Sequence, residues 1–271
     1  MNIVVVSGAF DNFNSSHIRF LEEASRLGTL HVLLWSDALT LAVKRESPKL
    51  LETERGYLLN SIRYVSRLTL IHDGNVAGQL PLDVTPSPDI WVSCEQADNA
   101  ARRTFSKAAG LEYRVLRTSD LSGFPTPEPR PPTPGRKKVV VTGCYDWFHS
   151  GHVRFCEEVS ELGDLYVIIG SDANVELLKG KGHPLFKQDE RRYVVGSVRH
   201  VTQCLISSGR GWMDAEPEIR RLKPDIYAVN EDGDKQEKLD FCRRMGLEYR
   251  VLKRTPKQGL TRRSSTDLRG F

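Results

Sequence analysis

The segment Thr142-Gly143-Cys144-Tyr145-Asp146-Trp147-Phe148-His149-Ser150-Gly151-His152 sets the architecture of this chain. It follows the apolar run of residues 139–141, and the residues after it repeat apolar side chains at the spacing of a helix. The pattern predicts a strand, a glycine-containing turn and a helix. His149 and His152 stand three residues apart at the start of that helix, so we expect both imidazoles to face one ligand.

The start of this predicted helix suits a phosphate group. A helix N-terminus offers unpaired backbone N–H groups and the positive end of the helix dipole. Gly151 has no Cβ, so we expect the ligand to approach the backbone closely there. The segment therefore predicts a phosphate-binding site. The alternative is a pair of surface histidines on an amphipathic helix.

Composition limits the classes of function. A chain of 271 residues is long enough for two modest domains, and a net charge of +4 spread along it fits anionic small molecules and does not indicate a nucleic-acid partner. The five cysteines are widely spaced and form no C-x-x-C pair, which is typical of a reducing compartment. No apolar run approaches the roughly 20 residues of a membrane span, and the start lacks the pattern of a signal peptide. We therefore expect a cytoplasmic protein without a membrane span.

The sequence also contains a long tandem repeat. Gly8 aligns with Gly143 at a separation of 135 residues. Many residues after Gly8 match the residues after Gly143 at the same separation. At a separation of 136, the segment Gly-Leu-Glu-Tyr-Arg-Val-Leu of residues 110–116 recurs unchanged at residues 246–252. This separation is far longer than the repeats of solenoids, so we interpret it as the duplication of a whole domain.

The first copy lacks part of the histidine motif. Asn14 stands where the second copy has His149, and Ser16 stands where it has Gly151. An asparagine carries no positive charge to a phosphate, and the Cβ of a serine crowds the backbone. Lys44 stands where the second copy has Lys179, so residual ligand binding by the first domain stays open. We predict that the first domain is non-catalytic.

Six prolines between residues 125 and 134 separate the two copies. Such a density excludes helix and favours extended polyproline geometry, which is typical of a linker. We predict a degenerate domain at residues 1–119, a proline-rich linker at 120–136 and a catalytic domain at 137–271. Strands alternate with helices in each domain, which predicts a parallel sheet flanked by helices, with ligands at the carboxyl ends of the strands.

The motif around the histidines resembles that of a known family. Gly143-Cys144-Tyr145-Asp146 and the following His-Ser-Gly-His resemble the G-T-F-D and H-x-G-H signatures of the cytidylyltransferase branch of the nucleotidylyltransferase superfamily, with Cys144 in place of the usual threonine. The resemblance implies two tandem Rossmann-like nucleotidylyltransferase domains of the α/β class. It also implies transfer of CMP from CTP to a phosphorylated small alcohol, such as phosphoethanolamine or glycerol phosphate, with release of pyrophosphate.

Further segments of the second copy are similar to the same family. Lys179 and Lys181 lie in a glycine-broken segment at residues 178–184, where cytidylyltransferases of the glycerol-3-phosphate type carry a lysine-bearing loop. Residues 254–266 resemble the R-T-x-G-I-S-T-T signature, stretched by several residues. Arg199 stands where the family has the arginine of R-Y-V-D-E-V, although the acidic pair of that motif is missing here.

The resemblance assigns a role to each matching position. The catalytic residues would be His149, His152, Lys179 and Arg254. The nucleotide site would comprise Gly143, Cys144, Tyr145, Asp146, Gly151, Lys181, Arg199, Asn230, Asp232, Thr255, Ser264, Ser265 and Thr266. Which of the last three hydroxyls contacts phosphate stays open. The family implies Mg²⁺ carried by the triphosphate of CTP, and a contact of Asp146 with the metal also stays open.

Two other functions remain open from the sequence. An adenylyltransferase acting on ATP shares the H-x-G-H signature, and a non-catalytic nucleotide-binding regulator would result if both copies had lost turnover. The tandem arrangement is similar to that of phosphoethanolamine cytidylyltransferases, whose two copies pack like a dimer. The resemblance therefore implies an internal pseudo-dimer, and it leaves open a further homo-oligomer and the identity of the acceptor.

Overall fold

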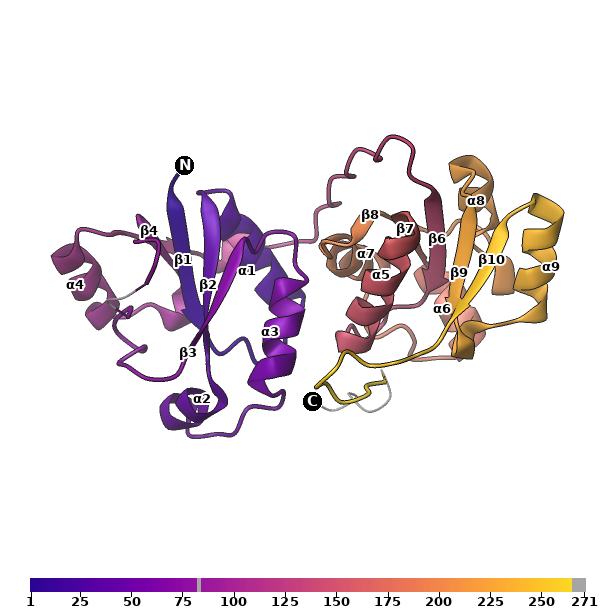
Figure 1. Ribbon diagram of the computed structural model, residues 1–271. Helices are drawn as coiled ribbons and strands as arrows, with labels where there is room; N and C mark the ends of the chain where they lie inside the picture. Colours follow the sequence, from indigo (N-terminus) through magenta and orange to yellow (C-terminus); the bar gives the residue numbers. More distant parts are fainter. Residues whose placement is uncertain (82–83, 265–271) are drawn as a thin grey trace. The chain divides into compact units, whose positions relative to one another are not determined.

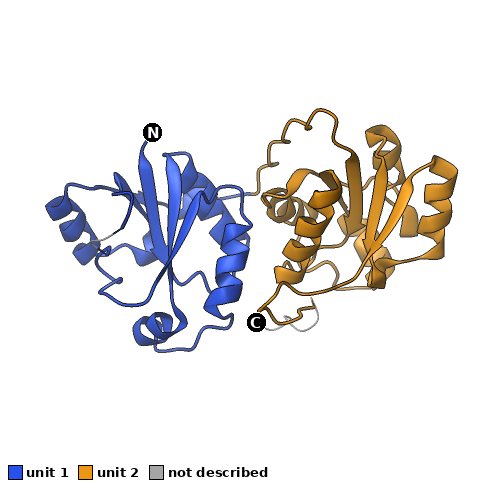
Figure 2. Cartoon of the chain, in the orientation of Figure 1, with its two compact units in different colours: residues 1–123, 271 blue, residues 124–270 orange. Residues whose placement is uncertain are grey.

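The computed structural model describes residues 1–81 and 84–264 (Figure 1). The chain divides into two compact units, of which the first spans Met1–Gly123 and the second begins at Phe124 (Figure 2). Each unit is a parallel five-stranded sheet flanked by helices, so the predicted α/β class with two Rossmann-like domains is confirmed. Within the described ranges, no helix is long and apolar enough to cross a bilayer.

The sheet of the first unit has the strand order β3-β2-β1-β4-β5. Its strands are β1 (Ile3–Gly8), β2 (Thr29–Trp35), β3 (Arg67–Ile71), β4 (Ile90–Cys94) and β5 (Glu112–Leu116). Its helices are α1 (Ser15–Ser25), α2 (Asp37–Lys44), α3 (Glu52–Asn60) and α4 (Ala100–Ala109), with 3₁₀ turns η1 (Glu95–Ala97) and η2 (Thr118–Leu121).

The sheet of the second unit has the order β10-β9-β6-β7-β8, which is the same topology read from the opposite edge of the sheet. Its strands are β6 (Lys138–Gly143), β7 (Asp164–Ile169), β8 (Val201–Ile206), β9 (Ile226–Asn230) and β10 (Glu248–Leu252). Its helices are α5 (Ser150–Leu162), α6 (Asp172–Lys179), α7 (Gln188–Gly196), α8 (Glu216–Leu222) and α9 (Gln236–Met245), with 3₁₀ turns η3 (Gly211–Met213) and η4 (Glu231–Gly233). The strand order reverses between β6 and β9, and ligands bind at the carboxyl side of such a reversal.

The apolar run before the histidine turn lies at the centre of the second unit. Val139, Val140 and Val141 of β6 are completely buried. Val139 and Val141 pack in a cluster with residues of α5 and α7, whereas Val140 packs with residues of α8 and α9 on the other face. Each such valine contributes about 1.5 kcal/mol by burial. The strand that leads into the histidines is therefore held from both faces of the sheet.

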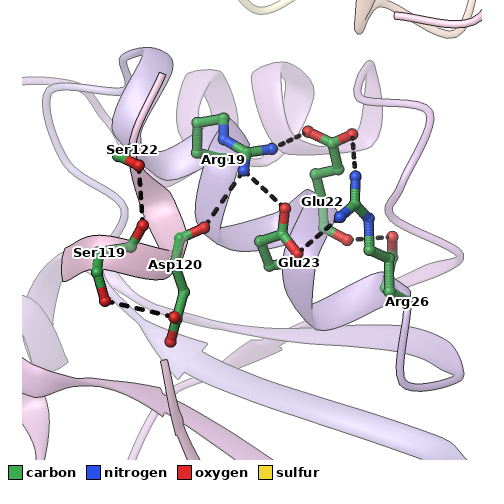
Figure 3. Close-up of polar contacts among 8 residues, drawn as sticks. Arg19, Glu22, Glu23, Arg26, Ser119, Asp120 and Ser122 are labelled. Carbon is green, nitrogen blue, oxygen red and sulfur yellow. Dashed lines mark hydrogen bonds and ion pairs between the residues drawn. The ribbon is translucent and has the colours of Figure 1, made fainter. Parts of the chain in front are cut away.

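The end of the first unit is tied to α1 by a network of charges (Figure 3). The buried guanidinium of Arg19 pairs with Glu22 and with Glu23, the latter at 2.7 Å. It also donates to the backbone oxygen of Asp120 in η2 at 3.3 Å. Residues 118–121 are therefore part of the first unit, although we predicted that the linker begins at residue 120.

The rest of the predicted linker packs on the second unit. The backbone N–H of Arg130 donates to the oxygen of Thr202 at 2.9 Å. The N–H and Oγ1 of Thr133 donate to the buried carboxylate of Asp164 at 2.6 and 3.0 Å. Residues 124–136 of the predicted linker belong to the second unit, and we call them the strap (Figure 2). A proline has no N–H to donate to a sheet, yet the N–H groups of Arg130 and Thr133 still find acceptors.

Candidate active site

The turn between β6 and α5 carries the two histidines. A Cβ on Gly143 would lie 2.8 Å from the ring of Tyr145, so this position requires a glycine. Tyr145 has a φ of 53°, in the left-handed region that residues with a Cβ rarely adopt. Its buried ring packs in the same core cluster as Val141, which compensates the backbone strain. The core therefore holds the chain in a sharp turn directly before the histidines.

The two imidazoles are held by backbone N–H groups. His149 is the N-cap of α5, and its Nδ1 accepts a hydrogen bond from the N–H of Gly151 at 3.1 Å. The Nδ1 of His152 accepts from the N–H of His149 at 3.3 Å. The two ring centroids lie 4.0 Å apart. Because Nδ1 is an acceptor in both rings, we assign the proton of each neutral ring to Nε2.

The surroundings of His152 keep its ring neutral. Burial lowers the pKa of His152 well below 6.5, and nearby His149, Arg254 and Lys179 lower it further. The ring of Phe148 stacks on it with centroids 5.7 Å apart. At pH 7 this imidazole is therefore a neutral hydrogen-bond donor through Nε2.

The structure gives a further reason for glycine at position 151. A Cβ at this position would lie 2.9 Å from Cε1 of His149 and 3.0 Å from its Nδ1. The missing side chain therefore makes room for the imidazole of His149, and its predicted role in admitting a ligand stays a prediction. In the first unit, Asn14 has no ring, and its Oδ1 accepts from the N–H of Ser16 at 3.0 Å.

A cavity of about 330 Å³ opens at the carboxyl ends of β6 and β9. It brings together many of the predicted site residues, although they come from distant parts of the sequence. These are Gly143, Cys144, Tyr145, Asp146, His149, Gly151, His152, Lys179, Asn230, Asp232, Arg254 and Ser264. The strand order places the cavity where ligands bind in open α/β sheets.

The structure does not bring every predicted residue to this cavity. Lys181 is exposed in the loop after α6, and Thr255 lines a small neighbouring pocket. Arg199 precedes β8 and therefore lies at the amino edge of the sheet, opposite the cavity, so its assignment to the nucleotide site is corrected. Ser265 and Thr266 lie outside the described residues.

The carboxylate of Asp146 anchors the loop that follows Lys179. Its Oδ1 accepts from the N–H groups of Leu185 and Phe186 at 2.7 and 3.0 Å, and its Oδ2 lies 3.5 Å from Nδ1 of His183. We call residues 180–187 the lysine loop. Among the residues that the structure describes, no group of three histidine, cysteine or acidic side chains could hold a metal ion. Asp146 therefore fits the role of a loop anchor better than that of a metal ligand.

Two cations border the cavity from opposite sides. Lys179 is the exposed last residue of α6, and Arg254 follows β10. The guanidinium of Arg254 pairs with the carboxylate of Asp232 and donates to the backbone oxygen of Arg263 at 3.0 Å. These contacts hold one cation at the cavity wall, whereas the other extends from the end of a helix.

Lys238 also lines the cavity and was not predicted. Its Nζ donates to the backbone oxygen of Gly233 at 3.1 Å, and burial lowers the pKa of its ammonium group. Helix α9 begins shortly after the loop that follows β9, so its first turns lie at the ligand-binding edge of the sheet. That position is the signal from which Lys238 could have been found. Thr142, Phe155 and Val229 line the cavity too, and their sequence context gave no signal.

Comparison with known proteins identifies the family. Residues 140–271 match the family described as cytidylyltransferase-like. Over 120 residues the chain is 35% identical to the FAD synthase of Ferroglobus placidus, which corresponds to 43% of this chain and 75% of that protein. This chain belongs to the cytidylyltransferase-like family. The predicted membership of the nucleotidylyltransferase superfamily is thereby confirmed, and the chain is a nucleotidyltransferase-type enzyme.

Other relatives of this cytidylyltransferase-like chain differ in how much of their length it covers. The FAD synthase of Archaeoglobus profundus is 34% identical over 134 residues, which is 48% of this chain and 83% of that protein. The bifunctional protein HldE of Campylobacter concisus is 38% identical over 100 residues, which is 36% of this chain and 21% of that protein. The chain thus spans most of the FAD synthases and about a fifth of this HldE.

The C-terminal segment of the cytidylyltransferase-like unit returns to the cavity. The Nζ of Lys257 pairs with Glu157 of α5 at 2.6 Å, and Ser264 lines the cavity. In the first unit, the corresponding stretch after β5 forms η2 and then continues into the strap. The first unit therefore lacks an equivalent of residues 258–264.

His17, the histidine that the first copy of the motif retains, occupies an apolar site. The ring of His17 lies 5.7 Å from that of Phe10 and 5.8 Å from that of Phe13. Burial and the charge of Lys44 together lower its pKa to about 4, although Asp11 acts in the opposite direction. With Asn14 as its neighbour, this turn presents one imidazole where the second unit presents two.

Proposed function

We propose that the second unit transfers CMP from CTP to a phosphorylated small alcohol and releases pyrophosphate. The observation that carries the proposal is the grouping of His149, His152, Lys179 and Arg254 around one cavity at the ligand edge of the sheet. Neutral N–H donors and cations around one cavity suit a triphosphate, whose negative charge shifts during transfer. The cytidylyltransferase-like family supports the same class of reaction.

The proposed chemistry needs no protein nucleophile. An oxygen of the acceptor phosphate attacks the α-phosphorus of the nucleotide, and a new P–O bond forms. The bond from the α-phosphorus to the bridging oxygen of the β-phosphate breaks, and pyrophosphate leaves with the electron pair. The acceptor oxygen is already anionic, so no general base is required. The protein contributes positioning and neutralisation of charge.

Each of the four residues has a role in this proposal. The Nε2–H groups of His149 and His152 donate to phosphate oxygens, which accumulate charge in the transition state. Lys179 offers a point charge, and Arg254 offers a planar fork that suits two phosphate oxygens. Arg254 exchanges its contact with Asp232 for the nucleotide when it binds.

The described residues do not form a resident metal site. Asp146 is engaged by the lysine loop, and Asp232 pairs with Arg254. Mg²⁺ is usually held by nucleotide phosphates with only one or two carboxylates. We therefore propose that any Mg²⁺ arrives on the triphosphate.

Transfer of AMP from ATP is the second candidate. FAD synthases are named for a product that contains an adenine nucleotide, and they are among the relatives of this chain. The same four residues would act on the phosphates of either nucleotide, because each of the roles proposed for them is toward phosphate oxygens. The nucleotide and the acceptor therefore have to be determined together.

Release of pyrophosphate tests the proposal. Wild-type protein is incubated with CTP or ATP and a panel of phosphorylated alcohols, sugar phosphates and FMN. His152→Ala should lower kcat by a factor on the order of 10² or more, because one preorganised donor is lost. The matched variant His17→Ala in the first unit should leave kcat unchanged.

Each outcome of this assay discriminates between the candidates. A signal with CTP and one phosphorylated alcohol supports the first candidate, and a signal confined to ATP supports the second. Equal losses in His152→Ala and His17→Ala would contradict the assignment of catalysis to the second unit. Nucleotide binding by calorimetry without turnover on any acceptor would favour a regulatory protein.

A further inference from the structure

The guanidinium of Arg191 joins three segments that surround the cavity. Its Nη1 donates to the backbone oxygen of Cys144 at 2.7 Å, and its Nε donates to that of Phe186 at 2.8 Å. Its Nη2 pairs with Oδ1 of Asp172 at 2.8 Å. The side chain is only 1% exposed. Arg191 thus connects the turn after β6, the end of the lysine loop and the first residue of α6.

Each of these segments leads to a residue proposed to act on phosphate. The turn after β6 continues into the histidine pair, and the lysine loop begins directly after Lys179. Helix α6 starts at Asp172 and ends at Lys179, so its first residue orients the helix that carries this lysine. The backbone N–H of Asp172 also donates to Oε1 of Gln188 at 2.9 Å, which ties α6 to α7.

The geometry of a guanidinium makes these connections rigid. Its N–H donors lie in one plane at fixed angles, whereas a lysine ammonium is a single flexible point charge. Three acceptors from three segments can be satisfied together only when the segments keep one relative arrangement. An effect of this kind matters because a displacement of about 1 Å in a catalytic group can cost on the order of 10² in rate.

We propose that Arg191 is a positioning residue that fixes Lys179 and the histidine turn relative to each other. Arg191 is not one of the described residues that line the cavity. It therefore acts through the three segments that it binds. This inference rests on the proposed function of the second unit. It adds a residue that lies outside every motif of the sequence.

The first unit contains a matching arginine. Arg55 is fully buried, its Nε donates to the oxygen of Leu50 at 2.9 Å, and its Nη2 pairs with Asp37 at 2.6 Å. Its Nη1 donates to the oxygens of Ala9 and Trp35. Because the first unit lacks the histidine pair, Arg55 contributes only to folding. The chain therefore supplies its own control for the structural part of the effect.

The test compares Arg191→Lys with Arg55→Lys in the full-length protein. Both variants should lower Tm, because each loses hydrogen bonds to two or more backbone oxygens and to an aspartate, and Arg55→Lys loses one bond more. At a temperature where both are folded, Arg191→Lys should lower kcat about tenfold or more with a smaller change in KM for the nucleotide. Arg55→Lys should keep kcat within about twofold of wild type.

A double variant tests whether Arg191 acts through Lys179. If it does, Lys179→Ala with Arg191→Lys should be about as active as Lys179→Ala alone. Trypsin provides a readout that needs no substrate. Cleavage after Lys179 and Lys181 should be faster in Arg191→Lys than in wild type and unchanged in Arg55→Lys, because only the former releases the lysine loop.

Clear results would overturn the proposal. Arg191→Lys with kcat within about twofold of wild type, and with a lowered Tm, would show a purely structural residue. If Arg191→Lys does not fold, Asp172→Asn with its counterpart Asp37→Asn is judged by the same criteria. Wild type without turnover or nucleotide binding would contradict the proposed function, whereas unchanged trypsin cleavage in a folded Arg191→Lys would contradict the role of Arg191 by itself.

Discussion

Single residues decide what each copy of the histidine turn can do. In the second unit, the Nδ1 atoms of His149 and His152 both accept backbone N–H groups, which assigns the remaining protons to Nε2. In the first unit, Asn14 replaces one ring, and its side-chain oxygen accepts the N–H groups of Ser16 and His17. The N–H of Gly151 in the second unit is likewise taken by Nδ1 of His149, so the substitution changes the turn chiefly by removing one imidazole donor.

The neutral state of His152 has a consequence for the pH dependence of turnover. Its pKa lies well below 6.5 because the ring is buried and because His149, Arg254 and Lys179 lie nearby. We expect kcat at saturating substrate to stay flat between about pH 6 and pH 8, since the ring does not titrate there. A rising limb near pH 6.5 that disappears in His152→Gln would contradict a neutral donor and would indicate a general base.

His17 should make the stability of the first unit depend on pH. Its pKa is lowered to about 4 in the folded state, whereas an unfolded histidine titrates near 6.5. Below pH 6.5 the unfolded chain therefore binds a proton that the folded chain does not, and stability falls as the pH falls toward 4. The expected loss at pH 5 is about 2 kcal/mol.

Urea unfolding at about pH 7 and pH 5 measures this loss. In His17→Gln the contribution is absent, so the free energy of unfolding of the first unit should change less between the two pH values than in wild type. Equal changes in both proteins would show that His17 is protonated or accessible in the folded state.

At the level of elements, local motifs predicted the site only where neighbours in sequence supply the geometry. The strand, turn and helix around His149 follow from the spacing of apolar residues and the glycines. Arg191 could not be predicted, because its partners lie 5, 19 and 47 residues away. Arg199 was misplaced because a motif does not tell which end of a strand its arginine faces. Lys238 was missed because its helix carries no motif.

The strap should contribute to the stability of the second unit. Asp164 is buried, and its two carboxylate oxygens each accept a hydrogen bond from Thr133. An amide at this position would replace one of these acceptors with a donor. We expect Asp164→Asn to lower the free energy of unfolding by about 1–3 kcal/mol. Pro131→Ala, at an exposed strap position, should change it by less than about 0.5 kcal/mol. Chemical denaturation of the full-length protein measures both, and equal small effects would show that the strap is dispensable for stability.

At the scale of the whole molecule, the repeat predicted two sheets with one topology, and both orders agree strand for strand. The repeat could not predict how the segment between the copies behaves, because proline content describes a local backbone preference and not its packing. The pairing of Asp164 with Thr133 depends on a residue far along the chain. The same limit applies to Ser264, which reaches the cavity only because the tail folds back along α5.

The route of the chain after the fifth strand also bears on the history of the duplication. In the second copy this stretch lines the cavity, whereas in the first copy it forms η2 and leads into the strap of the second unit. Two codon changes would return a histidine and a glycine to the first copy, but the missing segment would have to be inserted anew. The way in which the two copies are joined therefore keeps them different. Point mutations alone would not restore a second complete site in the first copy.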